Sequence, residues 1–287
     1  LPTTSPPKMC DTTVGWRFNN VKMDEMYPIV SLGEGAEIIA EEMQISRDDQ
    51  DAYSLESHSR AIAAINDGKF KDEIIEISVP QHRGDPVVVD TDEHPRYEKS
   101  NGRYEMAIDT ESLAKLHSAF KKDGTVTAGN SSGINDGAAA LLLANQDKAG
   151  ELGLKPLLRW VGSASAGTDP RHFAYGPVPA TEKLLERFNL TIDDIGLIEL
   201  NEAFASQTLG CMRQLGLDPA KTNVNGGAIA LGHPTGCSGS RILVTLMHEM
   251  KRRAPDMPKA KPFYGLATLC VGVGMGSATL VEWIGDN

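Results

Sequence analysis

The sequence predicts an α/β protein whose sheet is covered by helices on both faces. From about residue 155 onward, segments with the pattern of a strand alternate with segments with the pattern of a helix, and this alternation is typical of the class. Apolar residues make up 40% of the 287 residues, enough for a buried core, and no internal repeat is visible. At 30.9 kDa the chain is long enough for one large or two ordinary domains.

The first part of the chain is expected to be irregular and then helical. Residues 1–33 are rich in proline, methionine and glycine, which predicts an irregular opening. A helix is expected over 34–43. A second helix begins after Ser46, because Asp49 three residues later makes a capping-box-like start, and Gly68 is placed to end it.

The next part predicts a strand, a polar excursion, a helix and two apolar strands. Residues 73–79 alternate apolar and polar side chains, as a strand does. Residues 81–101 are polar and acidic and are expected to be exposed, and residues 111–120 return to a helix. The stretches 125–129 and 138–144 are apolar enough to predict buried strands.

The rest of the chain carries the alternation that defines the fold class. The expected elements are a strand over 157–161, a helix over 181–188, a strand over 195–200, helices over 203–215 and 238–252, and strands over 264–269 and 278–283. Such a succession builds a sheet with helices on both sides.

Four segments stand out by their composition. Residues 223–239 read Asn-Val-Asn-Gly-Gly-Ala-Ile-Ala-Leu-Gly-His-Pro-Thr-Gly-Cys-Ser-Gly and place His233 in a glycine-rich run, where a ligand can come close to the backbone. A lone histidine is weak evidence of a site, but three further segments accompany it. They are Leu-Asn-Glu-Ala-Phe at 200–204, Leu-Cys-Val-Gly-Val-Gly-Met-Gly-Ser at 269–277, and Thr-Ala-Gly-Asn-Ser-Ser-Gly-Ile-Asn-Asp-Gly-Ala at 127–138.

In order and spacing these segments resemble the active-site motifs of the thiolases, which make and break carbon–carbon bonds in 3-ketoacyl-CoA thioesters. The resemblance runs from about the start of the chain to its end. It implies the thiolase fold, an αβαβα layered sandwich, of which this chain would hold the C-terminal half and the loop domain. The implied divisions are a loop domain at 1–124, a remnant of the N-terminal domain at 125–154 and a C-terminal domain at 155–287.

The nucleophilic cysteine of the family has no counterpart here. Thiolases carry it in a Cys-Ser-Ser-Gly context, and the 287 residues contain no such segment. Cys10 is the only cysteine before residue 211, and its surroundings do not match. We therefore expect most of the N-terminal domain, with its nucleophile, to be absent from this chain, and the chain alone to be inactive.

The resemblance assigns roles to four catalytic residues. Cys270 is the acid and base that moves the proton at the reacting carbon, a task that suits a thiol. Alternate glycines over 272–276 let the acyl group approach the backbone. His233 activates the nucleophile or polarises the thioester oxygen, and Asn201, through a water, completes a first oxyanion hole with it. The N–H of Gly272 serves a second oxyanion hole.

Other residues fall at the family's substrate-binding positions. They are Ala128, Ser131 and Ser132 along the pantetheine tunnel, Phe173 and Ala203 at the acyl pocket, and Arg103, which stands two residues before the place where bacterial thiolases have a phosphate-binding arginine. A phenylalanine at the pocket predicts a preference for short acyl groups. Glu105 occupies the place of the arginine itself.

Composition limits the partners and cofactors. The formal net charge of −11 argues against nonspecific binding to nucleic acid, which depends on Lys and Arg. The resemblance implies acyl-CoA and CoA as substrates, no tightly bound cofactor, and a homodimer or homotetramer when the protein is complete. The four cysteines show no Cys-x-x-Cys pair, so neither zinc nor disulfides are suggested. No apolar run reaches the ~18 residues of a membrane span, and free thiols suit the cytoplasm or an organelle matrix.

Alternative functions remain in two classes. The glycine run lacks the Lys-Ser/Thr of a phosphate-binding loop, and the alternate glycines after Cys270 do not match a dinucleotide fingerprint. A ketoacyl synthase is disfavoured by the Cys270 motif, because those enzymes generally have no second cysteine for catalysis. A nucleophile-free chain that binds CoA or a partner subunit without catalysis stays open. So does a chain that cannot fold alone, because unpaired strands over 125–144 would leave an exposed sheet edge. The degradative or biosynthetic direction also stays open.

Overall fold

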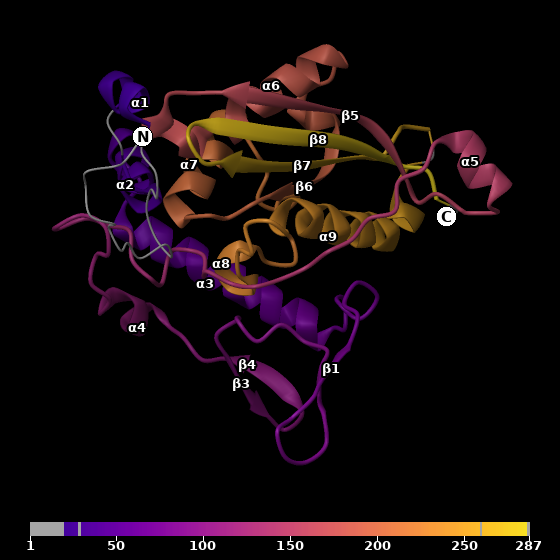
Figure 1. Ribbon diagram of the computed structural model, residues 1–287, viewed down its shortest axis with the longest axis horizontal. Helices are drawn as coiled ribbons and strands as arrows, with labels where there is room; N and C mark the ends of the chain where they lie inside the picture. Colours follow the sequence, from indigo (N-terminus) through magenta and orange to yellow (C-terminus); the bar gives the residue numbers. More distant parts are fainter. Residues whose placement is uncertain (1–19, 28–29, 259, 286–287) are drawn as a thin grey trace, which may run out of the picture.

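The computed structural model describes residues 20–27, 30–258 and 260–285 (Figure 1). At its centre lies a four-stranded sheet in the order β5-β8-β7-β6. Its strands are β5 (Leu158–Gly167), β6 (Ile195–Leu200), β7 (Tyr264–Val271) and β8 (Met275–Trp283). Strands β6 and β7 are parallel, whereas β8 is antiparallel to both of its neighbours. The predicted alternation over the C-terminal half is confirmed, and β6 has the predicted bounds.

Helices cover both faces of this sheet, as the class predicts. Helices α6 (Pro177–Arg187) and α7 (Ala205–Leu215) pack on one face, and α9 (Ser238–Arg253) packs on the other. Consecutive strand residues point to opposite faces: Ile198 joins the core under α6, while Leu197 joins the core under α9. Burying a Leu or Ile side chain completely contributes about 1.5–3 kcal/mol, so two apolar faces hold the sheet between its helices.

Two helices from the first third of the chain pack against this unit. Helix α2 (Leu32–Glu42) lies against α7, and α3 (Arg47–Asn66) crosses beside α7 and the short helix α8 (Ala228–Leu231). The capping box at Ser46 and Asp49 is confirmed. Gly68 follows the helix end with a φ of 69°, a conformation that glycine adopts without strain.

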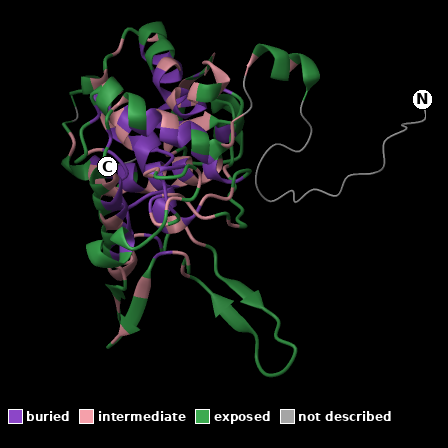
Figure 2. Cartoon of the chain, turned by 90° about the vertical axis from the view of Figure 1, so that its left-hand side faces the viewer, coloured by how far each residue is buried: buried purple, intermediate pink, exposed green. Residues whose placement is uncertain are grey.

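Two short ribbons project from the body. They are β1 (Ile77–Val79) with β2 (Val87–Val89), and β3 (Tyr97–Ser100) with β4 (Arg103–Met106). Most of their residues are exposed (Figure 2). The strand expected over 73–79 is shorter than predicted, since β1 covers only Ile77–Val79. The exposed excursion over 81–101 contains two strands that were not predicted, β2 and β3. Asn101 and Gly102 both have positive φ and make the β3–β4 turn, for which an Asn-Gly pair is the strongest local signal.

The predicted helix over 111–120 is too long. Helix α4 spans only Thr110–Ala114, because the following chain turns to pair with a later segment. Ala119 N–H donates to the carbonyl of Val126 at 2.9 Å, and Ser118 forms a bridge with Thr127.

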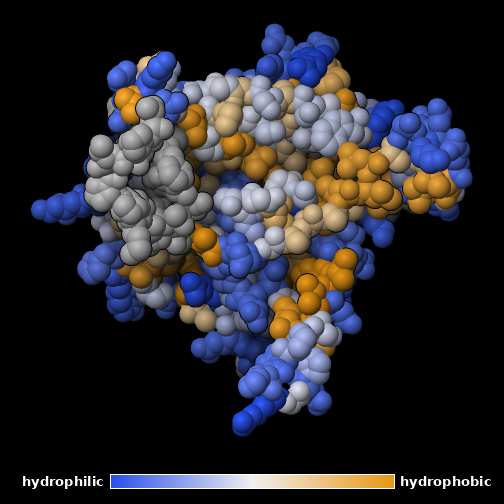
Figure 3. Space-filling view, viewed as in Figure 1, coloured by the Kyte–Doolittle hydropathy of each residue, from blue (hydrophilic) through white to orange (hydrophobic). Residues whose placement is uncertain are grey.

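The two strands predicted over 125–129 and 138–144 are wrong. The first stretch has its backbone donors taken by side chains: the Glu37 carboxylate accepts from Thr125 N–H at 2.9 Å and Val126 N–H at 2.8 Å. The second is extended but has no strand neighbour among the described residues, and Leu142 is 83% exposed. Figure 3 shows apolar side chains gathered on the face along which it runs.

The remaining elements are short connections. They are α1 (Val21–Met26), α5 (Gln146–Glu151) and the 3₁₀ turns Pro170–Tyr175, Ile192–Asp194 and Ala254–Asp256. The first of these helices falls inside the opening that was expected to be irregular. Within the described ranges, no helix has the length and apolar character to cross a membrane.

Candidate active site

The candidate site lies where two parallel strands end. Leu200 of β6 is paired with Thr268 of β7, and Asn201 N–H donates to the Thr268 carbonyl at 3.0 Å. Cys270 follows two residues later on β7. Because β6 and β7 are parallel, their carboxyl ends meet at one edge of the sheet, which is where α/β proteins place their sites. Asn201 and Cys270 therefore share that edge.

A turn after α8 brings His233 to the same place. Its backbone N–H donates to the carbonyl of Gly133 at 3.1 Å and to Asn135 Oδ1 at 3.3 Å. Gly232 has a φ of 93°, and a Cβ there would overlap the Asn135 amide. The glycine before His233 is thus required both by its backbone conformation and by the closeness of Asn135.

The His233 ring is held between two side chains. Its Nε2 lies 3.4 Å from Asn201 Nδ2, and its Nδ1 lies 2.7 Å from Ser238 Oγ. The Ser238 hydroxyl donates its single hydrogen to the Pro234 carbonyl at 3.0 Å, so it accepts from Nδ1–H. This assigns the proton to Nδ1 and leaves the lone pair of Nε2 facing the Asn201 amide. Burial, with a smaller contribution from Arg241, lowers the pKa of His233, which favours the neutral ring.

Cys270 is half-buried and packs against an apolar cluster that includes Phe173, Ala203 and Phe204. Burial raises the pKa of its thiol to about 12, so the resting form at neutral pH is the thiol. Cys211 has its pKa raised to about 12 by burial, and its thiol donates to the Ala174 carbonyl at 3.3 Å. All three described cysteines, the third being Cys237, are free.

The glycines after Cys270 serve two purposes. A Cβ on Gly276 would overlap the Gly176 carbonyl, and one on Gly274 would overlap the Thr168 carbonyl. These two glycines are needed because the chain's own backbone lies against them, which corrects the expectation that they make room for an acyl group. Gly272 differs, since a Cβ there would meet open space.

The predicted substrate loop packs beside the Asn201 segment. Ser132 donates to the Ala203 carbonyl from its N–H and its Oγ, each at 3.0 Å. Ser131 forms a bridge with Phe204, and its Oγ donates to the Thr127 carbonyl at 2.6 Å. Ala128 is exposed on the same loop. The structure therefore brings the loop and the Ala203 segment together.

Of the other two predicted substrate residues, Phe173 packs next to Cys270 and Ala203, whereas Arg103 lies elsewhere. Phe173 is only 3% exposed and packs in the cluster behind Cys270, where its ring fills the space beside Gly35. Arg103 is exposed on β4 and faces Ser100 across the projecting ribbon. No described contact joins Arg103 to the other predicted site residues. Cys10 lies outside the described residues.

Sequence reasoning did not assign three polar residues of this region, of which Ser238 and Glu202 are buried and Asn135 is half-buried. Ser238 orients the His233 ring, Asn135 holds its backbone, and Glu202 accepts four hydrogen bonds beside Asn201. Each stands inside one of the four quoted segments. Their position inside these segments was the available signal. The partners of Asn135 and Glu202 lie far away in the sequence, whereas Ser238 stands only five residues after His233.

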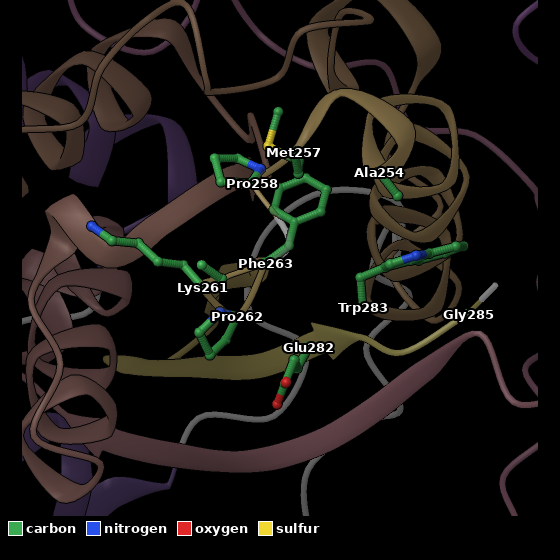
Figure 4. Close-up of a pocket in the computed structure, with 10 residues that line it drawn as sticks. Ala254, Met257, Pro258, Lys261, Pro262, Phe263, Glu282, Trp283 and Gly285 are labelled. Atoms are coloured by element: carbon green, nitrogen blue, oxygen red, sulfur yellow. The ribbon is translucent and has the colours of Figure 1, made fainter. Parts of the chain in front are cut away.

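The cavities in the described part of the chain include the following two. One of about 320 Å³ borders the His233 turn through Gly232 and Pro234 and is also lined by His94, Asn135 and Arg241. The other, of about 400 Å³, lies between the end of α9 and the end of β8 and contains none of the predicted residues (Figure 4). The described residues hold no cluster of His, Cys, Asp and Glu that could bind a metal.

Comparison with known proteins defines the class. Residues 12–147 match the family model "Thiolase, N-terminal domain", and residues 154–283 match "Thiolase, C-terminal domain". The chain belongs to the thiolase family, and its fold is a thiolase fold. The match to the N-terminal model does not confirm that most of that domain is absent, and the two domain matches give no support to the expectation that the chain alone is inactive.

Particular relatives follow from the same comparison. The chain is 51% identical to acetyl-CoA acetyltransferase of Chromobacterium violaceum, over 97% of this chain and 69% of that protein. It is 44% identical to beta-ketoadipyl-CoA thiolase of Acinetobacter baylyi, over 96% of this chain and 65% of that protein.

Solved structures agree. The Bacillus anthracis acetyl-CoA acetyltransferase has a TM-score of 0.81 at 45% identity, covering 90% of this chain and 61% of that one. Human mitochondrial 3-ketoacyl-CoA thiolase has a TM-score of 0.78 at 42% identity, covering 88% and 59%. The chain thus spans between 59% and 69% of the length of these four proteins.

Proposed function

We propose that this chain carries the proton-transfer part of a thiolase active site. The reaction is the reversible exchange between a 3-ketoacyl-CoA plus CoA and acetyl-CoA plus a shortened acyl-CoA. The observation that carries the proposal is the line formed by Asn201, His233 and Ser238, with separations of 3.4 and 2.7 Å, at the strand ends that also hold Cys270.

In the condensation direction, a proton must leave the carbon next to the thioester. The Cys270 thiolate takes it, and the negative charge moves to the thioester oxygen. The proton that His233 holds at Nε2 is the one released when the Cys270 thiol becomes a thiolate, and this Nε2–H then donates to that oxygen, together with Asn201 through a water. An oxyanion donor of this kind contributes about 3 kcal/mol to the stability of the transition state.

In the thiolysis direction, the carbon–carbon bond breaks and the departing carbon needs a proton. Burial keeps Cys270 as a thiol, with a pKa of about 12, so the proton is present before the reaction begins. The resting state therefore suits the acid role, and the base role requires Cys270 to lose its proton first. A Cβ on Gly272 would meet open space, and the Gly272 N–H is proposed as a donor to the second oxyanion.

The CoA thioester is proposed to approach along the loop of Ala128, Ser131 and Ser132, since this loop packs against Ala203. Phe173 and Arg103 stay sequence-based predictions for the acyl pocket and the CoA phosphates, and so do the three domain boundaries. A homodimer or homotetramer is likewise proposed. The exposed apolar side chains of the β1–β2 ribbon, such as Ile77 and Val87, support an interface, and sedimentation of the purified chain tests it.

The nucleophile is proposed to lie outside the described cysteines. Cys211 and Cys237 are buried, and burial raises the pKa of both thiols, whereas a nucleophilic cysteine needs a lowered pKa. Acetyl-CoA is mixed with the protein and the acetylated peptides are identified by mass spectrometry. We expect no acetyl group on Cys211, Cys237 or Cys270. Acetylation of Cys270 would make it the nucleophile and overturn its proposed role.

A second candidate function is a chain that binds CoA without catalysis. It is favoured by the absence of a Cys-Ser-Ser-Gly segment from the 287 residues. Both candidates predict binding of acetyl-CoA, but only the first predicts exchange of its methyl protons with solvent deuterium. Whether the reaction runs in fatty-acid degradation or in biosynthesis is decided by comparing rates with long and short 3-ketoacyl substrates.

A further inference from the structure

A buried carboxylate stands next to Asn201. Glu202 is 1% exposed, and each of its two oxygens accepts two hydrogen bonds. Oε1 accepts from Tyr53 Oη at 2.8 Å and Asn223 Nδ2 at 2.9 Å. Oε2 accepts from Ser57 Oγ at 2.7 Å and the backbone N–H of Ile229 at 3.1 Å. Four donors are enough to keep a carboxylate inside a protein without a cation.

These donors come from three separate parts of the chain. Tyr53 and Ser57 lie on α3, Asn223 lies in the segment beside β6, and Ile229 lies in α8. Helix α8 ends at Leu231, two residues before His233. Glu202 itself follows Asn201 directly. One carboxylate therefore connects the backbone that carries Asn201 with the helix that leads to His233.

Asn223 tightens the same connection. Its Oδ1 accepts from Leu200 N–H at 2.9 Å, and its Nδ2 donates to the Leu200 carbonyl at 2.8 Å. The residues on both sides of Asn201 are thus fixed, Leu200 by Asn223 and Glu202 by its four donors. The Asn201 side chain has little freedom to move away from the His233 ring.

Two glycines of the conspicuous run exist because of this arrangement. A Cβ on Gly227 would overlap the Glu202 carboxyl group, and one on Gly226, whose φ is 78°, would lie 2.6 Å from the Ser57 carbonyl. Gly227 N–H donates to Ser57 Oγ at 3.1 Å, so Ser57 accepts from one segment and donates to the other. These glycines permit α3 and Glu202 to come close and leave no room for a ligand.

We infer that Glu202 is a positioning residue, which holds Asn201 and His233 at the separation that the proton-transfer site needs. The inference rests on the proposed function, which gives this separation its purpose. The separation itself can be measured without any assay of that function. An ionised carboxylate only accepts hydrogen bonds, whereas an amide also donates. Glu202→Gln therefore places an NH₂ group against two donors and pushes the three connected segments apart.

The test is nuclear magnetic resonance of the 287-residue chain, which reads the site without any turnover. In the unmodified protein, the side-chain amide protons of Asn201 give nuclear Overhauser contacts to the His233 ring. In Glu202→Gln we expect loss of these contacts and a shift of the His233 Nε2 resonance. The matched control is Glu249→Gln, another buried carboxylate, which accepts from Asn225, Arg252 and Arg253; we expect both signals to be kept.

A milder variant covers the case in which Glu202→Gln does not fold. Tyr53→Phe combined with Ser57→Ala removes two of the four donors and leaves residues 200–202 and 223–233 unchanged, and it is expected to weaken the same contacts. If either folded variant keeps the Asn201–His233 contacts and the Nε2 resonance unchanged, Glu202 does not position the site. If the chain shows no acyl chemistry, the nuclear magnetic resonance result still stands. The proposed function and the positioning role of Glu202 can therefore fail independently.

Discussion

The hydroxyl of Ser238 lies 2.7 Å from Nδ1 of His233 and determines which ring nitrogen carries the proton. Because the hydroxyl hydrogen points to the Pro234 carbonyl, Ser238 accepts from the ring and leaves Nε2 free. Ser238 is the first residue of α9, so the end of a long helix that packs on the sheet fixes the chemistry of the histidine. This relationship underlies the first prediction.

Ser238→Ala removes the acceptor from Nδ1–H and allows the proton to move to Nε2. A buried donor left without a partner costs about 1–3 kcal/mol, and we expect the rate of methyl-proton exchange of acetyl-CoA to fall about tenfold, which corresponds to about 1.4 kcal/mol. The control is Ser206→Ala, a buried serine that donates to the Ala36 carbonyl at 2.9 Å. Equal losses in the two variants would show that the effect comes from stability and not from the ring.

The pH dependence of stability is predicted at His58. This histidine is 3% exposed on α3, and its Nδ1 accepts from Arg96 N–H at 3.2 Å. Burial, followed by the charges of His94 and Arg96, lowers its pKa from 6.5 to about 4. The unfolded chain therefore takes up the proton first as the pH falls.

The contribution of His58 to the free energy of unfolding is fully present above its ordinary pKa and is lost as the pH falls from 6.5 toward 4. The loss is at most about 1.4 kcal/mol per pH unit. In His58→Asn, whose amide oxygen can accept from Arg96 N–H, this part of the slope should disappear. Urea unfolding over a pH series measures both proteins, and an unchanged slope in the variant would contradict the assignment.

Close backbone packing predicts a strong effect at Gly276. A Cβ there overlaps the Gly176 carbonyl, and neither backbone can move without disturbing the β7–β8 turn. Gly276→Ala should lower the free energy of unfolding by more than about 3 kcal/mol. Gly236→Ala is the control, since its Cβ meets nothing within 4 Å, and a change within about 0.5 kcal/mol is expected. Similar decreases in the melting temperature of Gly276→Ala and Gly236→Ala would contradict this packing.

The exposed segment at 138–144 predicts self-association. It is extended, apolar and without a strand neighbour among the described residues, and such an edge readily pairs with another chain. Leu142→Lys places a charge on it, which should reduce light scattering at equal concentration while leaving the unfolding midpoint unchanged. Scattering that stays the same would locate the association elsewhere.

The sequence was sufficient where local pattern and burial agree. Strand β6 was predicted with its observed bounds because its apolar residues face two cores, and the Ser46–Asp49 cap was predicted because it is a contact between near neighbours. The apolar run at 138–144 has the same composition as a buried strand, and only its neighbours decide whether it is buried. For this reason it was predicted wrongly.

The site divides in the same way. His233, Asn201 and Cys270 stand in motifs whose resemblance to those of the thiolases identified them. The role of Glu202 could not be predicted in this way, because two of its hydrogen-bond donors, Tyr53 and Ser57, precede it by 149 and 145 positions. Gly274 and Gly276 show the converse: they were expected to make room for substrate, yet the contact that requires them is with the chain's own backbone around Thr168 and Gly176.

The most direct measurement is the exchange of the methyl protons of acetyl-CoA with deuterium oxide in the presence of the chain. It requires only the proton-transfer residues and no nucleophile. We predict exchange above the uncatalysed rate, at least about a hundredfold slower with Cys270→Ala and unchanged with Cys237→Ala, and binding of acetyl-CoA in all three proteins. Exchange that is absent from the unmodified chain, or that survives in Cys270→Ala, would contradict the assignment of the site.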